Sequence, residues 1–300
     1  HEFEPRYPLQ IGKTPTIVSA FCYPEFFGLM DTFMAATSRS AIGVFDSGIG
    51  GLTVVRALME RLPFEDIVYF GDTARVPYGV KSNDTILNFT TQIADFLLAR
   101  DVKLLIIACN TMAAVAGEAV RARSPVPVLD VIDAGARAAV DISQRGIGVI
   151  GTPTTVNSNA YARNIHALNP ALSVYSQACP LLVPLVEEGW LEHEVTRLTL
   201  REYLKPVFVE SIDALVLGCT HYPLLKPLIG QIAGPHIRLV DSAVTIAEQT
   251  ARVLTEMEMH NPQRIAPRYD YVVTDIPLRF QTIGSRFLGR ELSHLEQVRW

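Results

Sequence analysis

Short apolar runs alternate with longer helical patterns along the chain from Ala41 onward. The short runs are rich in β-branched and aliphatic residues, and this alternation is typical of βαβ units with a parallel sheet. The predicted strands are residues 41–45, 67–70, 104–108, 128–131, 148–150, 172–176, 214–217 and 237–240. One intervening segment, Ser82 to Arg100, begins with a good N-cap residue and repeats apolar residues on one helical face. The pattern predicts an α/β fold class in which helices flank parallel sheets.

The chain also repeats itself in two places. Residues 101–111 align with residues 211–221, and residues 42–47 align with residues 147–152. We therefore expect two pseudo-symmetric domains, each a parallel sheet flanked by helices. Because parallel sheets bind ligands beyond the carboxyl ends of their strands, the active site is expected in the cleft between the domains.

Cys109 and Cys219 occupy equivalent positions in this repeat. Each ends a predicted strand and precedes a predicted helix, whose free amides and positive dipole end favour the thiolate. A thiol pKa of about 8.5 lets one residue type act as both base and acid. A lone cysteine at a strand end is often only buried, but packing does not require the polar residues 110–111 and 220–221 that follow this pair. We interpret the two cysteines as thiols that exchange a proton on opposite faces of one small substrate.

A glycine-rich segment, residues 46–51, follows the first predicted strand. Its amides could hold a carboxylate or a phosphate. A dinucleotide-binding fingerprint would require glycine at the position of Thr53, which disfavours a nucleotide. Asp46 is a candidate for tuning a neighbouring thiol, and the alternative is that it caps a helix.

His221 follows Cys219 by two residues and could carry protons to or from the thiol. Cys-x-His offers too few ligands for a metal, and His166, His193 and His236 show no zinc spacing, so no metal site is predicted. A cysteine hydrolase needs one nucleophile and leaves the second cysteine unexplained.

Composition narrows the possible partners. The chain has 300 residues, about enough for two domains, and a net charge of -5. No cluster of basic residues contradicts that charge, so neither nucleic acid nor an anionic membrane is an expected partner. No apolar run reaches the ~18 to 20 residues of a membrane-spanning helix.

Four cysteines without a Cys-x-x-Cys pair indicate free thiols in a reducing cytoplasm. We expect the other two, Cys22 and Cys179, only to pack. Residues 1–40 lack the features of a secretory signal and are interpreted as an N-terminal extension, with the catalytic body starting near Met34.

Several motifs resemble those of the cofactor-independent aspartate/glutamate racemase family, and of glutamate racemases in particular. The motifs are residues 44–52, 76–79, 108–111 and 217–225, and the likeness extends to residues 271–275 and 286–289. The resemblance implies interconversion of L- and D-glutamate by two bases without pyridoxal phosphate or another cofactor. It also implies a homodimer that supplies D-glutamate for peptidoglycan in the bacterial cytoplasm.

The resemblance implies roles for individual residues. Cys109 would take the α-proton from D-glutamate and Cys219 from L-glutamate, with Asp46 and His221 assisting their respective thiols. The implied substrate-binding residues are Asp46, Ser47, Tyr78, Gly79, Asn110, Thr111, Thr220 and His221. An acidic residue near the site is placed at Glu187, with Glu188 as the alternative and a solvated helix charge as the competing explanation.

The expected domains are residues 41–136 together with 244–300, and residues 137–243, because the last segment of this family returns to the first domain. Ala134 stands where the family has proline, which places the local turn between the domains in doubt. A racemase acting on aspartate is the nearest alternative, and a regulatory protein that retains the fold is a more distant one.

Overall fold

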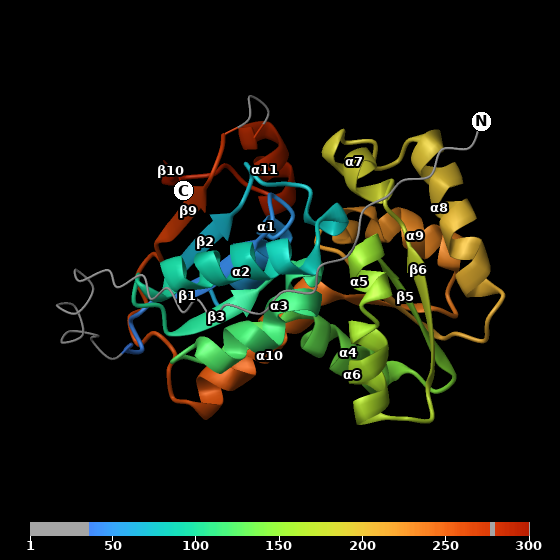
Figure 1. Ribbon diagram of the computed structural model, residues 1–300, viewed down its shortest axis with the longest axis horizontal. Coiled ribbons are helices and arrows are strands. Elements are labelled where there is room, and N and C mark those ends of the chain that lie inside the picture. The colour runs from blue at the N-terminus through green and yellow to red at the C-terminus, as the bar shows by residue number, and fades with distance from the viewer. Residues whose placement is uncertain (1–35, 277–279, 300) are drawn as a thin grey trace, which may run out of the picture. The chain divides into compact units, whose positions relative to one another are not determined.

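The structure is a computed structural model that describes residues 36–276 and 280–299. The chain divides into two units, His1–Met34 and Ala35–Trp300, and the second unit contains two parallel sheets (Figure 1). Cys22 and most of the predicted N-terminal extension lie outside the described residues. In the described part of the chain, no helix is long and apolar enough to cross a membrane.

The first sheet has six strands in the order β10-β9-β2-β1-β3-β4. Their bounds are β1 Ile42–Asp46, β2 Ile67–Gly71, β3 Leu104–Ile107, β4 Val128–Asp130, β9 Tyr269–Val273 and β10 Leu295–Gln297. The three central strands β2, β1 and β3 are buried along their whole length, as expected for a parallel sheet covered on both faces. Strands β9 and β10 were not predicted from the sequence.

The second sheet has four strands in the order β6-β5-β7-β8. Their bounds are β5 Gly146–Gly151, β6 Ser173–Ala178, β7 Ala214–Gly218 and β8 Arg238–Asp241. This order repeats the arrangement β2-β1-β3-β4 of the first sheet, and every pairing is parallel. The predicted α/β class with two similar halves is confirmed.

Helices cover both faces of each sheet. Their bounds are α1 Leu52–Arg61, α2 Asn83–Leu98, α3 Asn110–Arg123, α4 Val131–Ile142, α5 Pro153–Asn157, α6 Ala160–Leu168, α7 Leu182–Glu187, α8 Glu194–Phe208, α9 Lys226–Ala233, α10 Ser242–Glu256 and α11 Phe280–Leu288, with short 3-10 helices η1 Tyr78–Val80 and η2 Tyr222–Leu225. Ser82 caps α2 by accepting a hydrogen bond from the Thr85 amide at 3.3 Å, as its sequence predicts.

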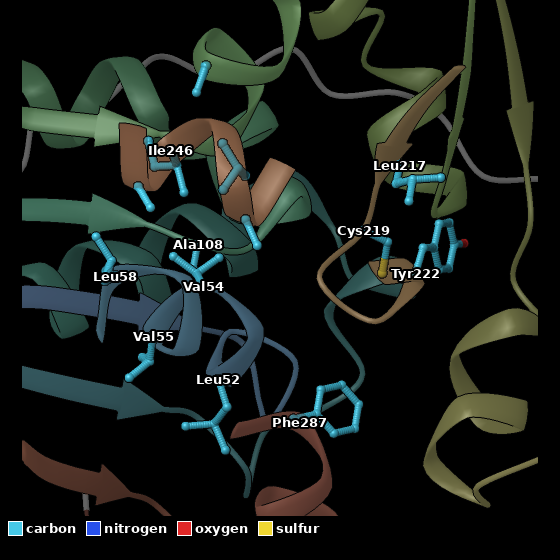
Figure 2. Packing of buried hydrophobic residues seen from close by; sticks show 14 of the residues in the cluster. Leu52, Val54, Val55, Leu58, Ala108, Leu217, Cys219, Tyr222, Ile246 and Phe287 are labelled. Carbon is cyan, nitrogen blue, oxygen red and sulfur yellow. The ribbon is translucent and has the colours of Figure 1, made fainter. Parts of the chain in front are cut away.

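Alternate side chains of each strand enter different hydrophobic clusters. In β1, Val44 packs with α1 and α10, whereas Phe45 packs with α2 and α3. Figure 2 shows part of the first of these clusters, which also includes Cys219 and Tyr222 of the second half and Phe287 of α11. One hydrophobic core therefore joins the two halves.

The chain passes between the sheets through α4 and through α10. Asp130 caps α4 and Asp241 caps α10, each by accepting hydrogen bonds from amides of the first turn. The two helices pack against each other, and each contacts strands of both sheets. Ala134, which placed the local turn between the domains in doubt, lies inside α4. The predicted domain limits fall within α4 and α10, and the division itself stays a prediction.

A buried ion pair lies at the amino ends of the strands of the first sheet. Lys103 Nζ is 2.5 Å from Glu65 Oε2 and donates to the carbonyl oxygens of Ser38 at 2.7 Å and Met259 at 2.9 Å. The Glu65 carboxylate also accepts from the Asn261 amide at 2.8 Å. This network ties the segment before β1 to the connection between α10 and β9.

Candidate active site

Strands from both halves end at one cavity of about 470 Å³. The predicted site residues that line it are Ser47, Tyr78, Gly79, Cys109, Asn110, Thr111, Glu187, Cys219, Thr220 and His221. Asp46, the residue before Ser47, is buried and is not among the lining residues. The structure thus brings the predicted residues of both halves together.

Cys109 follows β3 and is the N-cap residue of α3. Its side chain is 6% exposed, and its Sγ lies 3.4 Å from Ser47 Oγ. Burial raises the pKa of the thiol, and the charge of Asp46 raises it further. Hydrogen bonds from the Ser47 hydroxyl and the Met112 amide lower the pKa by less, so the result is about 12. The Met112 amide of α3 favours the thiolate, as the sequence predicts, but burial and the charge of Asp46 outweigh it, so the balance favours the protonated thiol.

Cys219 follows β7 and is also 6% exposed. A turn and the short helix η2, rather than a regular α-helix, come directly after it. Its Sγ lies 3.9 Å from His221 Nδ1, and His221 Nε2 lies 2.9 Å from Glu187 Oε1. These three side chains form a continuous hydrogen-bonded chain behind the second thiol.

Two partners hold the proton on His221. Burial alone would lower the pKa of the imidazole, but hydrogen bonds with Cys219 and Glu187 outweigh it and raise the pKa to about 10. Of the two acidic residues considered from the sequence, Glu187 is the one that lines the cavity and contacts His221.

Asp46 links the first half to the loop that carries Cys219. Its Oδ1 accepts from the Gly48 amide at 2.9 Å, and its Oδ2 accepts from the Thr220 hydroxyl at 3.2 Å. Burial raises the pKa of Asp46, although His221 and these hydrogen bonds oppose the rise. The N-cap residue of α1 is Gly51, so the alternative that Asp46 caps this helix is wrong.

The glycine-rich loop packs directly on the Cys219 loop. A Cβ atom added at Gly50 would lie 2.2 Å from Thr220 Oγ1 and 2.6 Å from His221 Nδ1. Thr53 Oγ1 lies within hydrogen-bonding distance of the Thr220 carbonyl oxygen, at 3.0 Å, and of the Gly50 carbonyl oxygen, at 2.9 Å. The glycine-rich loop of the first half therefore packs against the Cys219 loop of the second half and fixes their relative position.

Asn110, Thr111 and Tyr78 give one wall of the cavity a polar lining, in which Asn110 keeps a donor that is unpaired within the described part of the chain. Asn110 Oδ1 accepts from the Tyr161 hydroxyl at 2.8 Å, while the buried Asn110 Nδ2 has no partner among the described residues. Thr111 Oγ1 lies 3.0 Å from Thr152 Oγ1, and the Tyr78 hydroxyl donates to Asp72. An unpaired buried amide is costly, so this wall is suited to a ligand that supplies an acceptor such as a carboxylate.

Thr152 lines the cavity but was not predicted. It occupies the position equivalent to Ser47 in the internal repeat, so the alignment of residues 42–47 with 147–152 contained the signal. Pro180 and Val183 also line the cavity, and no local pattern marks them.

The fold and the cavity define an α/β enzyme whose acid–base side chains meet between two similar halves. The chain belongs to the Asp/Glu/hydantoin racemase family, whose model matches residues 42–250. The chain is thus an isomerase of the racemase class, and the resemblance drawn from its motifs is confirmed.

Relatives with assigned names cover most of the chain. A glutamate racemase of Syntrophus aciditrophicus is 67% identical over 258 residues, which are 86% of this chain and 96% of the relative. One of Neisseria meningitidis serogroup A is 65% identical and covers the same shares of both chains. The crystal structure of glutamate racemase from Francisella tularensis in complex with D-glutamate is 46% identical, with a TM-score of 0.83 over 87% of this chain and 98% of that one.

Proposed function

We propose that this protein interconverts L- and D-glutamate by passing the α-proton between Cys219 and Cys109 without a cofactor. The observation that carries the proposal is that both thiols, one from each half, line the same cavity. The choice of glutamate is supported by the names of the relatives and by the D-glutamate bound in the Francisella tularensis structure.

In the L-to-D direction, the thiolate of Cys219 removes the α-proton of L-glutamate. The electron pair of the broken C–H bond stays on the substrate and delocalises into the α-carboxylate. Cys109, whose pKa of about 12 keeps it protonated, donates its proton to the opposite face and becomes the thiolate. The reverse direction exchanges the two roles, and proton exchange restores the starting state between turnovers.

His221 and Glu187 serve the Cys219 side of the reaction. His221 Nδ1 faces the sulfur and can exchange a proton with it, while Glu187 fixes the other ring nitrogen. Asp46 acts by its charge on Cys109 and by its hydrogen bond to Thr220.

Donors at the N-terminus of α3 and in the loops hold the substrate carboxylates. Asn110 and Thr111 lie in the first turn of α3, where main-chain amides have no partner within the helix. The remaining contacts come from Ser47, Tyr78, Gly79, Thr220 and His221. Such preorganised donors also stabilise the negative charge that develops at the α-carbon.

The test is racemisation of each glutamate enantiomer in deuterated water without added pyridoxal phosphate, for wild type, Cys109→Ser and Cys219→Ser. We expect wild type to incorporate deuterium at the α-carbon during inversion and each variant to racemise far more slowly. Unchanged racemisation in either variant excludes that cysteine from the reaction, and faster turnover of aspartate in a substrate panel excludes glutamate as the preferred substrate.

The same resemblance supports a physiological role in the cytoplasm, as a homodimer that supplies D-glutamate for peptidoglycan. Expression in a bacterium that requires D-glutamate should restore growth without the supplement. Light scattering should give twice the chain mass.

We also propose that residues 41–136 and 244–300 form one domain and that residues 137–243 form the other. Limited proteolysis, which cleaves preferentially between domains, tests this division.

A further inference from the structure

The motif at residues 286–289 has no part in the proton transfer described above, yet it contacts His221 and Glu187. It ends α11, which packs against α1 of the first half. A Cβ atom at Gly284 would lie 2.5 Å from Leu292 Cδ1 and 3.4 Å from Leu52 Cδ1, so the helix is closely seated. Phe287, labelled in Figure 2, is buried in the core that joins the two halves, and so is Leu288.

Phe287 holds the imidazole ring of His221 from the side. The two ring centroids are 5.0 Å apart and the rings are nearly perpendicular, at 80°. This edge-to-face geometry is favourable for aromatic pairs. The ring nitrogens of His221 face Cys219 on one side and Glu187 on the other. The ring could still rotate about the axis between these two partners, and contact with Phe287 restricts that rotation.

Arg286 holds the helix that carries Glu187. Its Nη1 donates to the carbonyl oxygens of Val186 at 3.4 Å and Glu187 at 3.3 Å, at the C-terminal end of α7. A cation at this position complements the helix dipole, and it adds to the hydrogen bond that the Val186 carbonyl oxygen already accepts from the Gly189 amide at 2.9 Å. Gly189 has a φ of +79°, and a Cβ atom there would lie 2.7 Å from Arg286 Nη1, so glycine permits this approach.

We propose that Arg286 and Phe287 are positioning residues, which hold Glu187 and His221 in line with Cys219 from the opposite half of the molecule. The inference rests on the proposed racemase reaction and deepens it. It assigns α11 to the Cys219 side of the reaction, while no hydrogen bond joins Cys109 to that helix among the described residues.

The kinetic test uses Phe287→Leu and Arg286→Met, with Gln281→Ala as an exposed control on the same helix. Loss of the aromatic contact should lower kcat about threefold to tenfold, and loss of the guanidinium about tenfold. Arg286→Lys, which keeps a cation at the end of α7, should retain more activity than Arg286→Met. Gln281→Ala should behave as wild type.

Isotope effects separate positioning from a general loss of structure. Two enantiomers have equal free energy, so kcat/KM must fall equally in both directions whichever base is affected. If the step at Cys219 becomes slower, the isotope effect on kcat/KM rises for α-deuterated L-glutamate and falls for α-deuterated D-glutamate. A loss of activity with both isotope effects unchanged would show a structural role only and overturn the proposal.

The titration of His221 gives a readout that does not depend on activity. Nuclear magnetic resonance of histidine-labelled protein, assigned with His221→Gln, should show a lower pKa for His221 in both variants, because its contacts with Cys219 and Glu187 loosen while Asp46 is unchanged. An unchanged titration in folded variants contradicts the proposal. If wild type does not racemise glutamate but the titration still moves, the positioning contact stands and the proposed reaction fails. Should Phe287→Leu not fold, the half-buried Arg286 variants decide the question.

Discussion

Gly50→Ala tests whether the close packing of the two halves governs the chemistry. The added methyl group must displace Thr220 Oγ1, at 2.2 Å, by about 1.2 Å before it reaches the 3.4 Å at which ordinary contact begins. His221 Nδ1, at 2.6 Å, must move by about 0.8 Å. Neither side chain can move freely, because Asp46 holds Thr220 and Glu187 holds His221.

A displacement of this size at reacting groups costs about a hundredfold in rate, so kcat should fall by about that factor. Overpacking should cost about 1–3 kcal/mol of unfolding free energy, which leaves the protein folded at 25 °C. Steady-state racemisation monitored by circular dichroism, with urea denaturation of the same samples, measures both. Gly230→Ala makes the same chemical change outside the cavity lining and serves as the control. A folded Gly50→Ala protein with wild-type kcat would show that the packing of the glycine-rich loop on the Cys219 loop does not control the rate.

Other changes test stability and protonation. Lys103→Met leaves the carboxylate of Glu65 buried without Lys103 and should lower the unfolding free energy by about 3–5 kcal/mol, measured by urea denaturation. The double variant Lys103→Met with Glu65→Gln should recover much of that loss, and equal losses in the two proteins would contradict this prediction. Gly230 lies in the interior of α9, where an added Cβ would meet Leu239 Cδ1 in ordinary contact at 3.7 Å, so Gly230→Ala should raise the unfolding free energy by about 0.4–1 kcal/mol. His221 has its pKa raised from 6.5 to about 10, so its contribution to stability is complete below pH 6.5 and is lost as the pH rises through 10. Across that range, unfolding free energy should fall more steeply for wild type than for His221→Gln, and parallel curves would exclude a protonated His221.

Five of the strands predicted from the sequence, β1, β2, β3, β5 and β7, are buried along their whole length, whereas the other three, β4, β6 and β8, are only partly buried. Segments such as Leu104–Ile107 are wholly apolar and stand between helical patterns, which makes them recognisable locally. Tyr269–Val273 contains Asp270 and is only partly buried, and Leu295–Gln297 has a single apolar residue. These two strands depend on pairing with β2 and with each other, and no local pattern specifies that pairing.

The internal repeat predicted the two thiols, and the family resemblance predicted Tyr78, Gly79 and Glu187, which lie outside the repeat and line the cavity. The repeat pairs Cys109 with Cys219 and would also have identified Thr152 beside Ser47. The contact of Thr53 with Thr220 joins residues that are 167 positions apart, so it follows only from the fold. The raised pKa of Cys109 could not be predicted for the same reason, because burial in the complete fold outweighs the local effect of the helix amides.

The position of β9 and β10 in the first sheet has a consequence for synthesis of the chain. The edge of β2 stays unpaired until the residues of the entire second half have been made, because its partner β9 follows them in the sequence. An open edge of this kind promotes aggregation of incomplete chains. A truncation just before β9 would expose this edge and would also remove Arg286 and Phe287. The shortened protein would therefore be prone to aggregate and would lose the contacts that position His221.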